Sequence, residues 1–221
     1  MVSLPQFQSH HDCTRCELHE EARNPGVPTI HYDKSVFPSP DNPFLVVVGM
    51  NPGINEDRAN KPFVGPTGQM LKDVYLSSMN ILDKYTVYFS NAARCCTPGN
   101  TNLKNSHITK CFHYTKEDIQ TISKWHNAQG YVMCLGSHAV NAVTKNYFGK
   151  AMSLSNSLNR QGYAISDKLN FFATYHPAGV MRTPKLKFAV AEHLQVISQQ
   201  MTGAIPTPSS PTFIEPRAPY E

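Results

Sequence analysis

The sequence predicts an α/β protein, a three-layer α/β/α sandwich built on a central four-stranded parallel sheet. Two observations predict this class. Short apolar runs rich in β-branched and aromatic residues recur along the chain, as expected of parallel strands buried on both faces. Segments with helical periodicity lie between and after these runs. The alternation of strand and helix favours a parallel sheet with helices on both faces.

The expected elements follow one another in a regular order. We expect strands at Phe44–Gly49, Thr86–Ser90, Tyr131–Gly136 and Phe171–Tyr175. We expect helices at Thr67–Met79, Lys116–His126, Ser137–Phe148 and Lys185–Met201. Residues 1–202 are expected to form one domain. Residues 203–221 are expected to form a disordered or loosely docked tail, because prolines and small polar residues leave little there to pack.

Composition sets limits on the class of protein. The 221 residues, 40% of them hydrophobic, can bury one sizeable core. A formal net charge of +4 is compatible with a polyanionic partner but does not require one. No apolar run reaches the roughly 18 residues of a membrane span, and the first residues lack the pattern of a signal peptide. We therefore expect a soluble, monomeric protein in the cytoplasm or another intracellular compartment, with no membrane partner.

The six cysteines point to metal or redox chemistry, because disulfides are rare in a reducing compartment. Residues 13–16 form a Cys-x-x-Cys pair, and Cys95 and Cys111 could close a four-thiolate site. Such a site suits tetrahedral zinc or an iron–sulfur cluster, and the spacing does not separate the two. The alternative is that later cysteines are buried as small hydrophobic side chains, as expected for Cys134. Cys96 is a further candidate ligand.

Polar residues follow the predicted strands, and ligands of such sheets bind outside the carboxyl ends of the strands. The loop Gly49-Met50-Asn51-Pro52-Gly53 comes directly after the first strand. Its glycines allow a sharp turn, and its proline stiffens the display of Asn51, although an ordinary turn has the same composition. Asn91 comes directly after the second strand. Its carboxamide offers a donor and an acceptor that match uracil and not cytosine, although a turn-forming role is the simpler alternative.

Two further segments suit a base-binding pocket. Phe63 lies between structure breakers, so it could form a pocket wall and stack on a nucleobase, or else belong to the core. His176 follows the fourth strand, at the same sheet edge as Asn51 and Asn91. After it, apolar residues adjoin a basic one, which suits a wedge that enters a duplex and fills the gap left by a flipped base. The residues of this wedge are Val180, Met181 and Arg182.

In their order and spacing, these motifs resemble the uracil-DNA glycosylase superfamily, in particular its iron–sulfur branch, family 4. The resemblance runs from about residue 13 to about residue 194. It is carried by Cys13, Cys16, Asn51-Pro52-Gly53, Glu56-Asp57-Arg58, Pro62-Phe63-Val64-Gly65, Asn91, Cys95, Cys111 and His176-Pro177. The resemblance implies a [4Fe–4S] cluster held by Cys13, Cys16, Cys95 and Cys111. It leaves Cys96 and Cys134 outside the ligand set.

The resemblance also implies a monofunctional glycosylase of base excision repair that removes uracil from single- or double-stranded DNA. Asn51 and His176 are the expected catalytic residues. The base-binding residues are expected to be Gly49, Met50, Pro52, Gly53, Phe63 and Asn91. Val180, Met181 and Arg182 are expected to contact DNA.

The active-site loop departs from family 4, which usually carries Glu-Ala where this chain has Met50-Asn51. The loop Gly-Met-Asn-Pro-Gly is similar to that of the single-strand-selective glycosylases. Oxidised uracils such as 5-hydroxymethyluracil, and hypoxanthine, are therefore further candidate substrates. A non-catalytic DNA-binding relative and a covalent uracil-trapping relative are the alternative interpretations. The trapping subgroup uses a histidine in a loop near the position of Thr101–His107, where this chain has His107.

Overall fold

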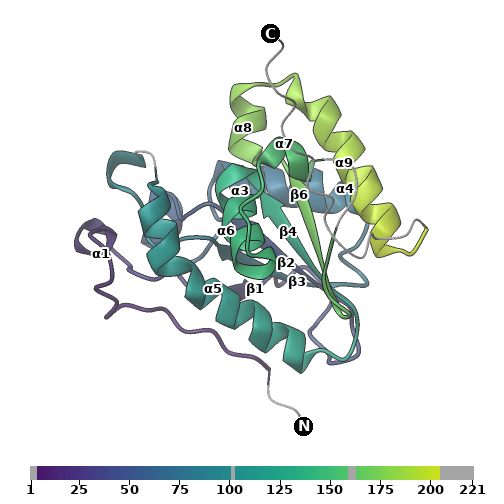
Figure 1. The fold of residues 1–221 in the computed structure, drawn as a ribbon, viewed down its shortest axis with the longest axis horizontal. Helices are drawn as coiled ribbons and strands as arrows, with labels where there is room; N and C mark the ends of the chain where they lie inside the picture. The colour runs from purple at the N-terminus through teal and green to yellow at the C-terminus, as the bar shows by residue number, and fades with distance from the viewer. Residues whose placement is uncertain (1–3, 101–102, 159–162, 205–221) are drawn as a thin grey trace.

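A six-stranded sheet runs through the middle of the molecule in the order β1-β3-β2-β4-β6-β5 (Figure 1). The computed structural model describes residues 4–100, 103–158 and 163–204. The four central strands are parallel to one another. They are β2 (Phe44–Gly49), β3 (Thr86–Asn91), β4 (Gly130–Leu135) and β6 (Leu169–Thr174). The four predicted strands and their parallel arrangement are confirmed, with shifts of one or two residues at some ends.

Two short antiparallel strands at the edges make the sheet mixed, which the sequence did not predict. β1 (Ile30–His31) pairs with β3, and β5 (Tyr163–Ser166) pairs with β6. β1 has two residues and β5 has four. Segments of that length are too short to show the alternation by which an edge strand is recognised.

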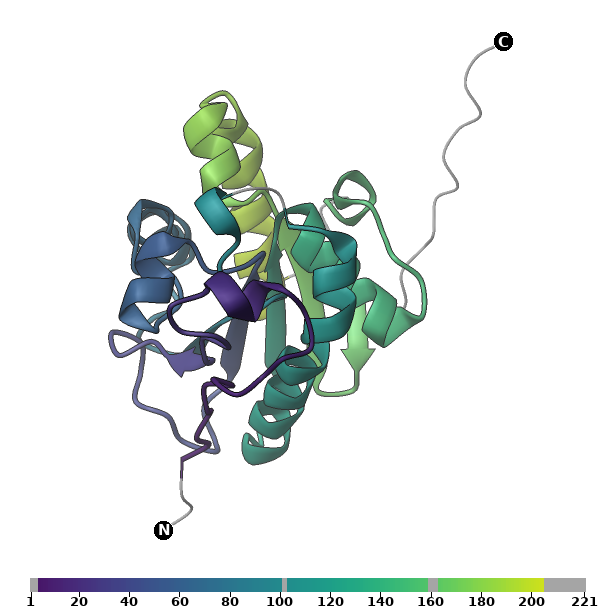
Figure 2. The ribbon, with the colours of Figure 1, turned by 90° about the vertical axis from the view of Figure 1, so that its left-hand side faces the viewer.

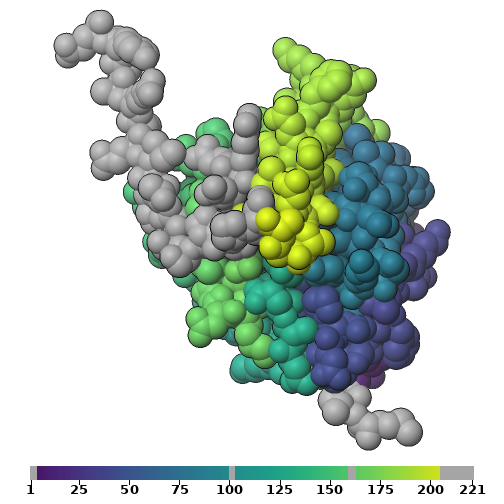
Figure 3. All heavy atoms as spheres, turned by 90° about the vertical axis from the view of Figure 1, so that its right-hand side faces the viewer, coloured from purple at the N-terminus to yellow at the C-terminus, as the bar shows by residue number. Residues whose placement is uncertain are grey.

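Helices cover both faces of the sheet, which confirms the three layers (Figures 1 and 2). One face is covered by α5 (Asn105–Trp125), α6 (Gly136–Phe148) and the short α7 (Leu154–Ser157). The other is covered by α3 (Pro66–Met70), η1 (Leu71–Leu76), α4 (Ser77–Met79) and α9 (Leu186–Met201). Figure 3 shows α9 on the surface, beside the segment that runs through η1 and α4.

The two apolar cores follow from the alternation of side chains along β2. Val46 and Val48 pack in the core beneath α5 and α6. Leu45 and Val47 pack in the core beneath η1 and α9. All six residues of β2 are buried, because both faces of the sheet are covered.

Each of the four predicted helices has an observed counterpart, with one large difference in length. The segment predicted at Thr67–Met79 is one continuous rod made of α3, the π-helical η1 and α4. The helix predicted at Lys116–His126 begins at Asn105, so Cys111 lies inside α5. The short elements α1 (Leu18–Glu21), α2 (Ile54–Ala59), α7, α8 (Pro177–Arg182) and the 3-10 turn η2 (Pro98–Asn100) were not predicted.

The strand order predicts where on the sheet a ligand binds, namely at the carboxyl ends of the parallel strands. The chain passes from β2 outward to β3 and then returns past β2 to β4, so the order reverses at β2. The carboxyl ends of the parallel strands around such a point form a crevice.

Of the predicted tail, residues 205–221 lie outside the described residues, and Gly203 and Ala204 are exposed after α9. None of the helices in the described ranges is long and apolar enough to cross a membrane.

Candidate functional site

A cavity of about 380 Å³ opens at the carboxyl ends of β2, β3 and β6. Four residues that the sequence proposed for the site line it together, although they are far apart in the chain: Asn51, Phe63, Asn91 and His176. Four further residues that the sequence proposed also line the wall, namely Met50, Pro52, Gly53 and Arg182, together with Glu56 and Thr97.

Asn51 is held by main-chain carbonyl groups. The ladder between β2 and β3 continues past the strand ends, where Ala92 N donates to Gly49 O (2.8 Å) and Ala93 N donates to Met50 O (2.9 Å). This brings Cys95 beside the loop. Asn51 Nδ2 donates to Pro52 O (3.1 Å) and to Cys95 O (3.3 Å). The opposite orientation of the amide would set an oxygen against two carbonyl oxygens, so Oδ1 is left as the acceptor available to the cavity.

Gly49 separates Asn91 from Phe63, and its lack of a side chain makes their approach possible. A Cβ atom at Gly49 would lie 2.5 Å from Asn91 Oδ1 and 2.7 Å from Phe63 Cζ. Asn91 is buried, and its main-chain oxygen accepts a hydrogen bond from Thr115 Oγ1 (2.6 Å). Gly49 itself does not line the cavity in the described structure; it lies behind the two side chains that do.

Phe63 has a backbone conformation that residues other than glycine rarely adopt. Its φ of +55° is in the left-handed region, which costs a non-glycine residue about 1 kcal/mol. Lys72 Nζ donates to Phe63 O (2.8 Å), and Gly68 packs against the same peptide, where a Cβ would lie 2.1 Å from Phe63 O. The ring meets the edge of Phe89 at a centroid distance of 5.3 Å. The neighbours therefore fix the ring in the wall of the cavity.

Glu56 is a residue of the cavity wall whose contacts the sequence did not predict. Its Oε2 accepts from Gly53 N (3.1 Å), and its Oε1 accepts from Gly65 N (2.6 Å). The side chain thus joins the loop that carries Asn51 to the loop that carries Phe63. One signal was present in the sequence, since a glutamate three residues after the residue that precedes a helix matches the capping box.

His176 precedes α8 and caps that helix. Its Nδ1 accepts a hydrogen bond from Ala178 N (3.2 Å), which places the ring proton of the neutral tautomer on Nε2. Burial, and secondarily the positive charge of Arg182, lower the pKa of His176 to about 4. The side chain is therefore a neutral N–H donor at physiological pH.

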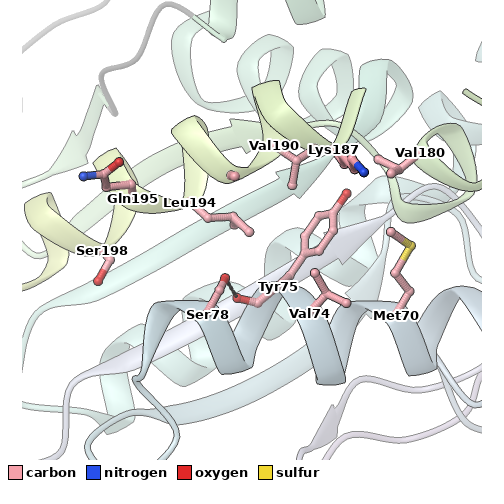
Figure 4. A pocket seen from close by; sticks show the side chains of 11 residues that line it. Met70, Val74, Tyr75, Ser78, Val180, Lys187, Val190, Leu194, Gln195 and Ser198 are labelled. Carbon is pink, nitrogen blue, oxygen red and sulfur yellow. Dashed lines mark hydrogen bonds between the residues drawn. The ribbon is translucent and has the colours of Figure 1, made fainter. Parts of the chain in front are cut away.

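The three residues predicted to contact DNA face different surroundings. Val180 is 4% exposed and packs in the core beneath η1 and α9. Figure 4 shows it in a second cavity, of about 270 Å³, together with Tyr75 and Lys187. Met181 is 51% exposed, and Arg182 lines the first cavity. Met181 and Arg182 are therefore exposed to solvent, whereas Val180 faces inward.

The four cysteines of the predicted ligand set converge on one small cavity. Cys13 and Cys16 come from the segment before α1, Cys95 from the loop after β3, and Cys111 from within α5. Main-chain N–H groups point at two of the sulfur atoms, from Gly26 to Cys95 Sγ (3.4 Å) and from Arg94 to Cys111 Sγ (3.2 Å). None of the six cysteines, all of which lie in the described ranges, forms a disulfide.

The shared cavity of the four cysteines bears on the kind of metal centre that they could hold. Within the described ranges, no group of three or more His, Cys, Asp or Glu side chains is placed to hold a single metal ion. The ligands of a four-iron cluster sit on separate iron atoms and are spread more widely, around a core that fills the space between them. Cysteines that surround one cavity, with N–H groups directed at the sulfurs, fit that arrangement.

The other two cysteines lie apart from this cavity in the described structure. Cys96 is buried, and its Sγ donates to Thr97 O (3.4 Å). Cys134 is fully buried within β4. Neither side chain therefore lines the cavity on which the four predicted ligands converge.

His107, the candidate for covalent trapping, is buried at the start of α5 and does not line the cavity that contains Asn51. Its Nδ1 accepts from Lys104 N (3.3 Å), and its Nε2 contacts Glu17 Oε1 at 2.8 Å. Both ring nitrogens are engaged, so in this conformation His107 caps α5 and ties it to the segment that carries Cys16.

Comparison with known proteins gives one family and several relatives. A family model described as the uracil DNA glycosylase superfamily matches residues 37–197. The chain is 28% identical over 178 residues to the Type-4 uracil-DNA glycosylase of Archaeoglobus fulgidus, which covers 79% of this chain and 81% of the relative. It is 26% identical over 190 residues to that of Sulfurisphaera tokodaii, with 85% and 79% covered. It is 27% identical over 180 residues to that of Pyrobaculum aerophilum, with 80% and 83% covered.

Proposed function

The chain belongs to the uracil DNA glycosylase superfamily, and we propose that it is a monofunctional uracil-DNA glycosylase that flips uracil out of DNA and hydrolyses the N-glycosidic bond. The product would be an abasic site in an uncut strand. The observation that carries this proposal is the convergence of Asn51, Phe63, Asn91 and His176 on one cavity. The names of the Type-4 relatives support the choice of uracil.

Base recognition is assigned to Phe63 and Asn91. A base that enters the cavity can stack on the ring of Phe63, which its neighbours hold in place. The carboxamide of Asn91 can pair with the ring N–H and the adjacent carbonyl of uracil. Cytosine presents the reverse pattern and would leave buried polar groups unpaired, which is the strongest way for a site to reject an analogue.

His176 is assigned to the departing base. When the bond between N1 of uracil and C1′ of the sugar breaks, its electron pair stays on the base, and negative charge develops on the uracil oxygen. The neutral Nε2–H of His176 can donate to that oxygen, an interaction that strengthens as the charge develops. Because Ala178 N occupies Nδ1, the proton is held on the nitrogen that can face the cavity.

Asn51 is assigned to the attacking water. With Nδ2 anchored to two carbonyl groups, Oδ1 can accept a hydrogen bond from a water molecule and hold it near C1′. The water oxygen adds to C1′, and the proton it loses balances the charge left on the base. An amide is not a strong base, so Asn51 orients the water without deprotonating it beforehand.

The four cysteines are proposed to hold a [4Fe–4S] cluster. When bound, the cluster would join the N-terminal segment, the loop after β3 and α5 by covalent bonds. The N–H groups of Gly26 and Arg94 would donate to the sulfurs of Cys95 and Cys111. We assign the cluster a structural role, since it would fix the segment that carries both Asn91 and Cys95 to the N-terminal segment and to α5.

Contact with DNA is assigned to Arg182, which lines the cavity, and to its exposed neighbour Met181. Because the loop carries Met50-Asn51, we propose that the enzyme also accepts bases other than uracil, with 5-hydroxymethyluracil and hypoxanthine as the candidates.

The covalent alternative is disfavoured, because both ring nitrogens of His107 are engaged at the start of α5.

Excision assays test this proposal. Oligonucleotides that carry uracil, 5-hydroxymethyluracil or hypoxanthine, each as single and double strands, are incubated with the protein and then cleaved at abasic sites by alkali. We expect cleavage at uracil. Binding without abasic sites would indicate a non-catalytic relative, and a protein–DNA adduct that survives boiling would indicate covalent trapping. Either outcome would overturn the proposal.

A further inference from the structure

We propose that Glu56 is a positioning residue that sets the spacing between the water-holding and base-stacking sides of the cavity. This inference rests on the proposed function and deepens it. Glu56 lies in the first turn of α2, and its carboxylate binds two loops. One is the loop after β2 that carries Asn51, bound at Gly53 N, and the other is the loop that carries Phe63, bound at Gly65 N. The side chain of Glu56 joins these two walls of the cavity through one hydrogen bond to each.

The contacts of Glu56 are close on both sides. Oε1 lies 2.6 Å from Gly65 N, and Oε2 lies 3.1 Å from Gly53 N. A Cβ at Gly53 would lie 2.8 Å from Oε2, and one at Gly65 would lie 3.1 Å from Oε1. Both neighbours are therefore glycines that let the carboxylate meet the main chain directly. The side chain is only 8% exposed.

A carboxylate is the group that this position requires. It has two acceptor oxygens and no donor, and it meets two N–H donors. The equal-sized amide of glutamine would offer one oxygen and one NH2 group, so one donor would face another donor. Both oxygens of Glu56 are engaged by the main chain, so its role is to hold the loops and not to contact the reacting atoms.

Asp57 provides a matched control in the next position. Its Oδ2 accepts from Arg23 N (2.9 Å), and its Oδ1 accepts from Asn24 N (3.0 Å). It is 7% exposed, so its burial matches that of Glu56. The two carboxylates thus bind main-chain donors in the same way, but Asp57 joins α2 to the N-terminal segment and not to the cavity.

The experiment compares Glu56→Gln with Asp57→Asn in the cluster-containing full-length protein. Each substitution replaces one acceptor oxygen by a donor, so we expect both variants to lose thermal stability to a similar extent. Only Glu56→Gln should change the chemical step. A displacement of about 1 Å can lower a rate by up to about a hundredfold, so we expect kcat on uracil-containing DNA to fall by roughly tenfold to a hundredfold. Binding to DNA that carries a tetrahydrofuran abasic analogue should stay within about twofold, because the lost contact acts on the chemical step.

Several outcomes would overturn the inference. Equal losses of kcat in both variants, in step with their stability, would show a general structural role. A change confined to KM or to DNA binding would also contradict it. If Glu56→Gln does not fold, Gly53→Ala replaces it, since the added Cβ would push Oε2 away from Gly53 N while Glu56 keeps its carboxylate. An unchanged kcat in Gly53→Ala would then count against the positioning role.

A second measurement separates this inference from the proposed function. The amide resonances of Gly53 and Gly65 in an NMR spectrum report their hydrogen bonds to Glu56 directly. We expect both to shift in Glu56→Gln and neither to shift in Asp57→Asn. If the wild-type protein excised no base, the proposed function would fail, whereas unshifted glycine resonances would refute the Glu56 contacts themselves.

Discussion

The side chain of Asn51 donates to the main-chain oxygen of Cys95 across 3.3 Å, while the sulfur of Cys95 faces the four-cysteine cavity. One residue therefore belongs to both sites. Its carbonyl orients the amide that is proposed to hold the attacking water, and its thiol is proposed to bind the cluster. The side chain of Asn51 thus faces two acceptors, Pro52 O and Cys95 O, so a substitution that removes its N–H donor should disturb its position.

We predict that Asn51→Ala abolishes detectable excision and that Asn51→Asp does not accelerate it. A carboxylate at this position would face Pro52 O and Cys95 O, and repulsion between oxygens would turn it away from its present place. We expect Asn51→Asp to be slower than the wild type by at least about tenfold, a loss of the size expected when a positioning contact is removed. Single-turnover excision of uracil measures both rates, and DNA binding should change little. An Asn51→Asp enzyme faster than the wild type would contradict this interpretation.

Replacing Gly49 should close the base pocket without unfolding the protein. In Gly49→Ala the new methyl group would press on Asn91 Oδ1 and the ring of Phe63, at 2.5 and 2.7 Å. We expect uracil excision to fall by roughly a hundredfold, the scale of a small displacement at the reacting centre. Gly179→Ala in α8 is the control for folding, since no atom lies within 4 Å of its added Cβ. A Gly49→Ala variant as active as the wild type would show that the observed packing does not shape the pocket.

The strands and the site loops could be predicted because their signals are local. The run Phe44–Gly49 is apolar throughout, since β2 is covered on both faces, and its bounds were predicted to the residue. The N-terminal half of α5, residues 105–115, was missed because its buried side chains Ile108, Phe112 and Thr115 are interspersed with polar residues and two histidines. Cys111 was consequently placed before a helix and not within one.

The contacts of Glu56 and the burial of Val180 depend on tertiary structure. The carboxylate of Glu56 binds Gly65 N, nine residues away, and no periodicity specifies that contact. Val180 and Met181 are neighbours in sequence, but successive helical residues point about 100° apart. In α8 this turns Val180 toward η1 and α9 and leaves Met181 in solvent. The sequence showed the apolar character of the segment but not its helical form, which decides which side chain is exposed.

His176 should act as a neutral donor throughout the ordinary working range of pH. Because burial lowers its pKa to about 4, protonation of His176 should not affect kcat between pH 8 and about 5. We expect His176→Ala to lower kcat by about 10²- to 10³-fold, as removal of a donor to a developing oxyanion does. The pH profile of kcat checks the first point. An acid limb with an apparent pKa near 6.5 that disappears in His176→Ala would contradict it.

Loss of one cluster ligand should affect folding as well as colour. We predict that Cys13→Ala yields colourless, poorly folded protein, because the proposed cluster joins the N-terminal segment, the loop after β3 and α5. Cys96→Ala is the matched control, since Cys96 is buried next to Cys95 but lies apart from the cysteine cavity. Iron content, visible absorbance and the thermal midpoint measure the difference. A well-folded and active Cys13→Ala protein would remove the case for a structural cluster.

The stability of the fold should fall in mild acid, and His126 should contribute to that fall. The side chain is 0% exposed, and its ring nitrogens contact Asn42 O (2.8 Å) and Tyr88 Oη (3.1 Å). Burial lowers the pKa of His126 to about 4, against an ordinary value of 6.5. Between these values the unfolded chain binds a proton that the folded protein excludes, so the free energy of unfolding decreases as pH falls from 6.5 toward 4.

The size of this effect can be measured with one substitution. A shift of this extent corresponds to roughly 3 kcal/mol of unfolding free energy lost once the pH is below both values. His126→Gln should be less stable than the wild type at pH 7.5, because it loses part of the buried hydrogen bonding. Its free energy of unfolding should decline less steeply on acidification, because one titrating group is gone. Urea unfolding at pH 7.5, 6 and 5 gives the two slopes, and parallel slopes would show that His126 does not titrate in this range.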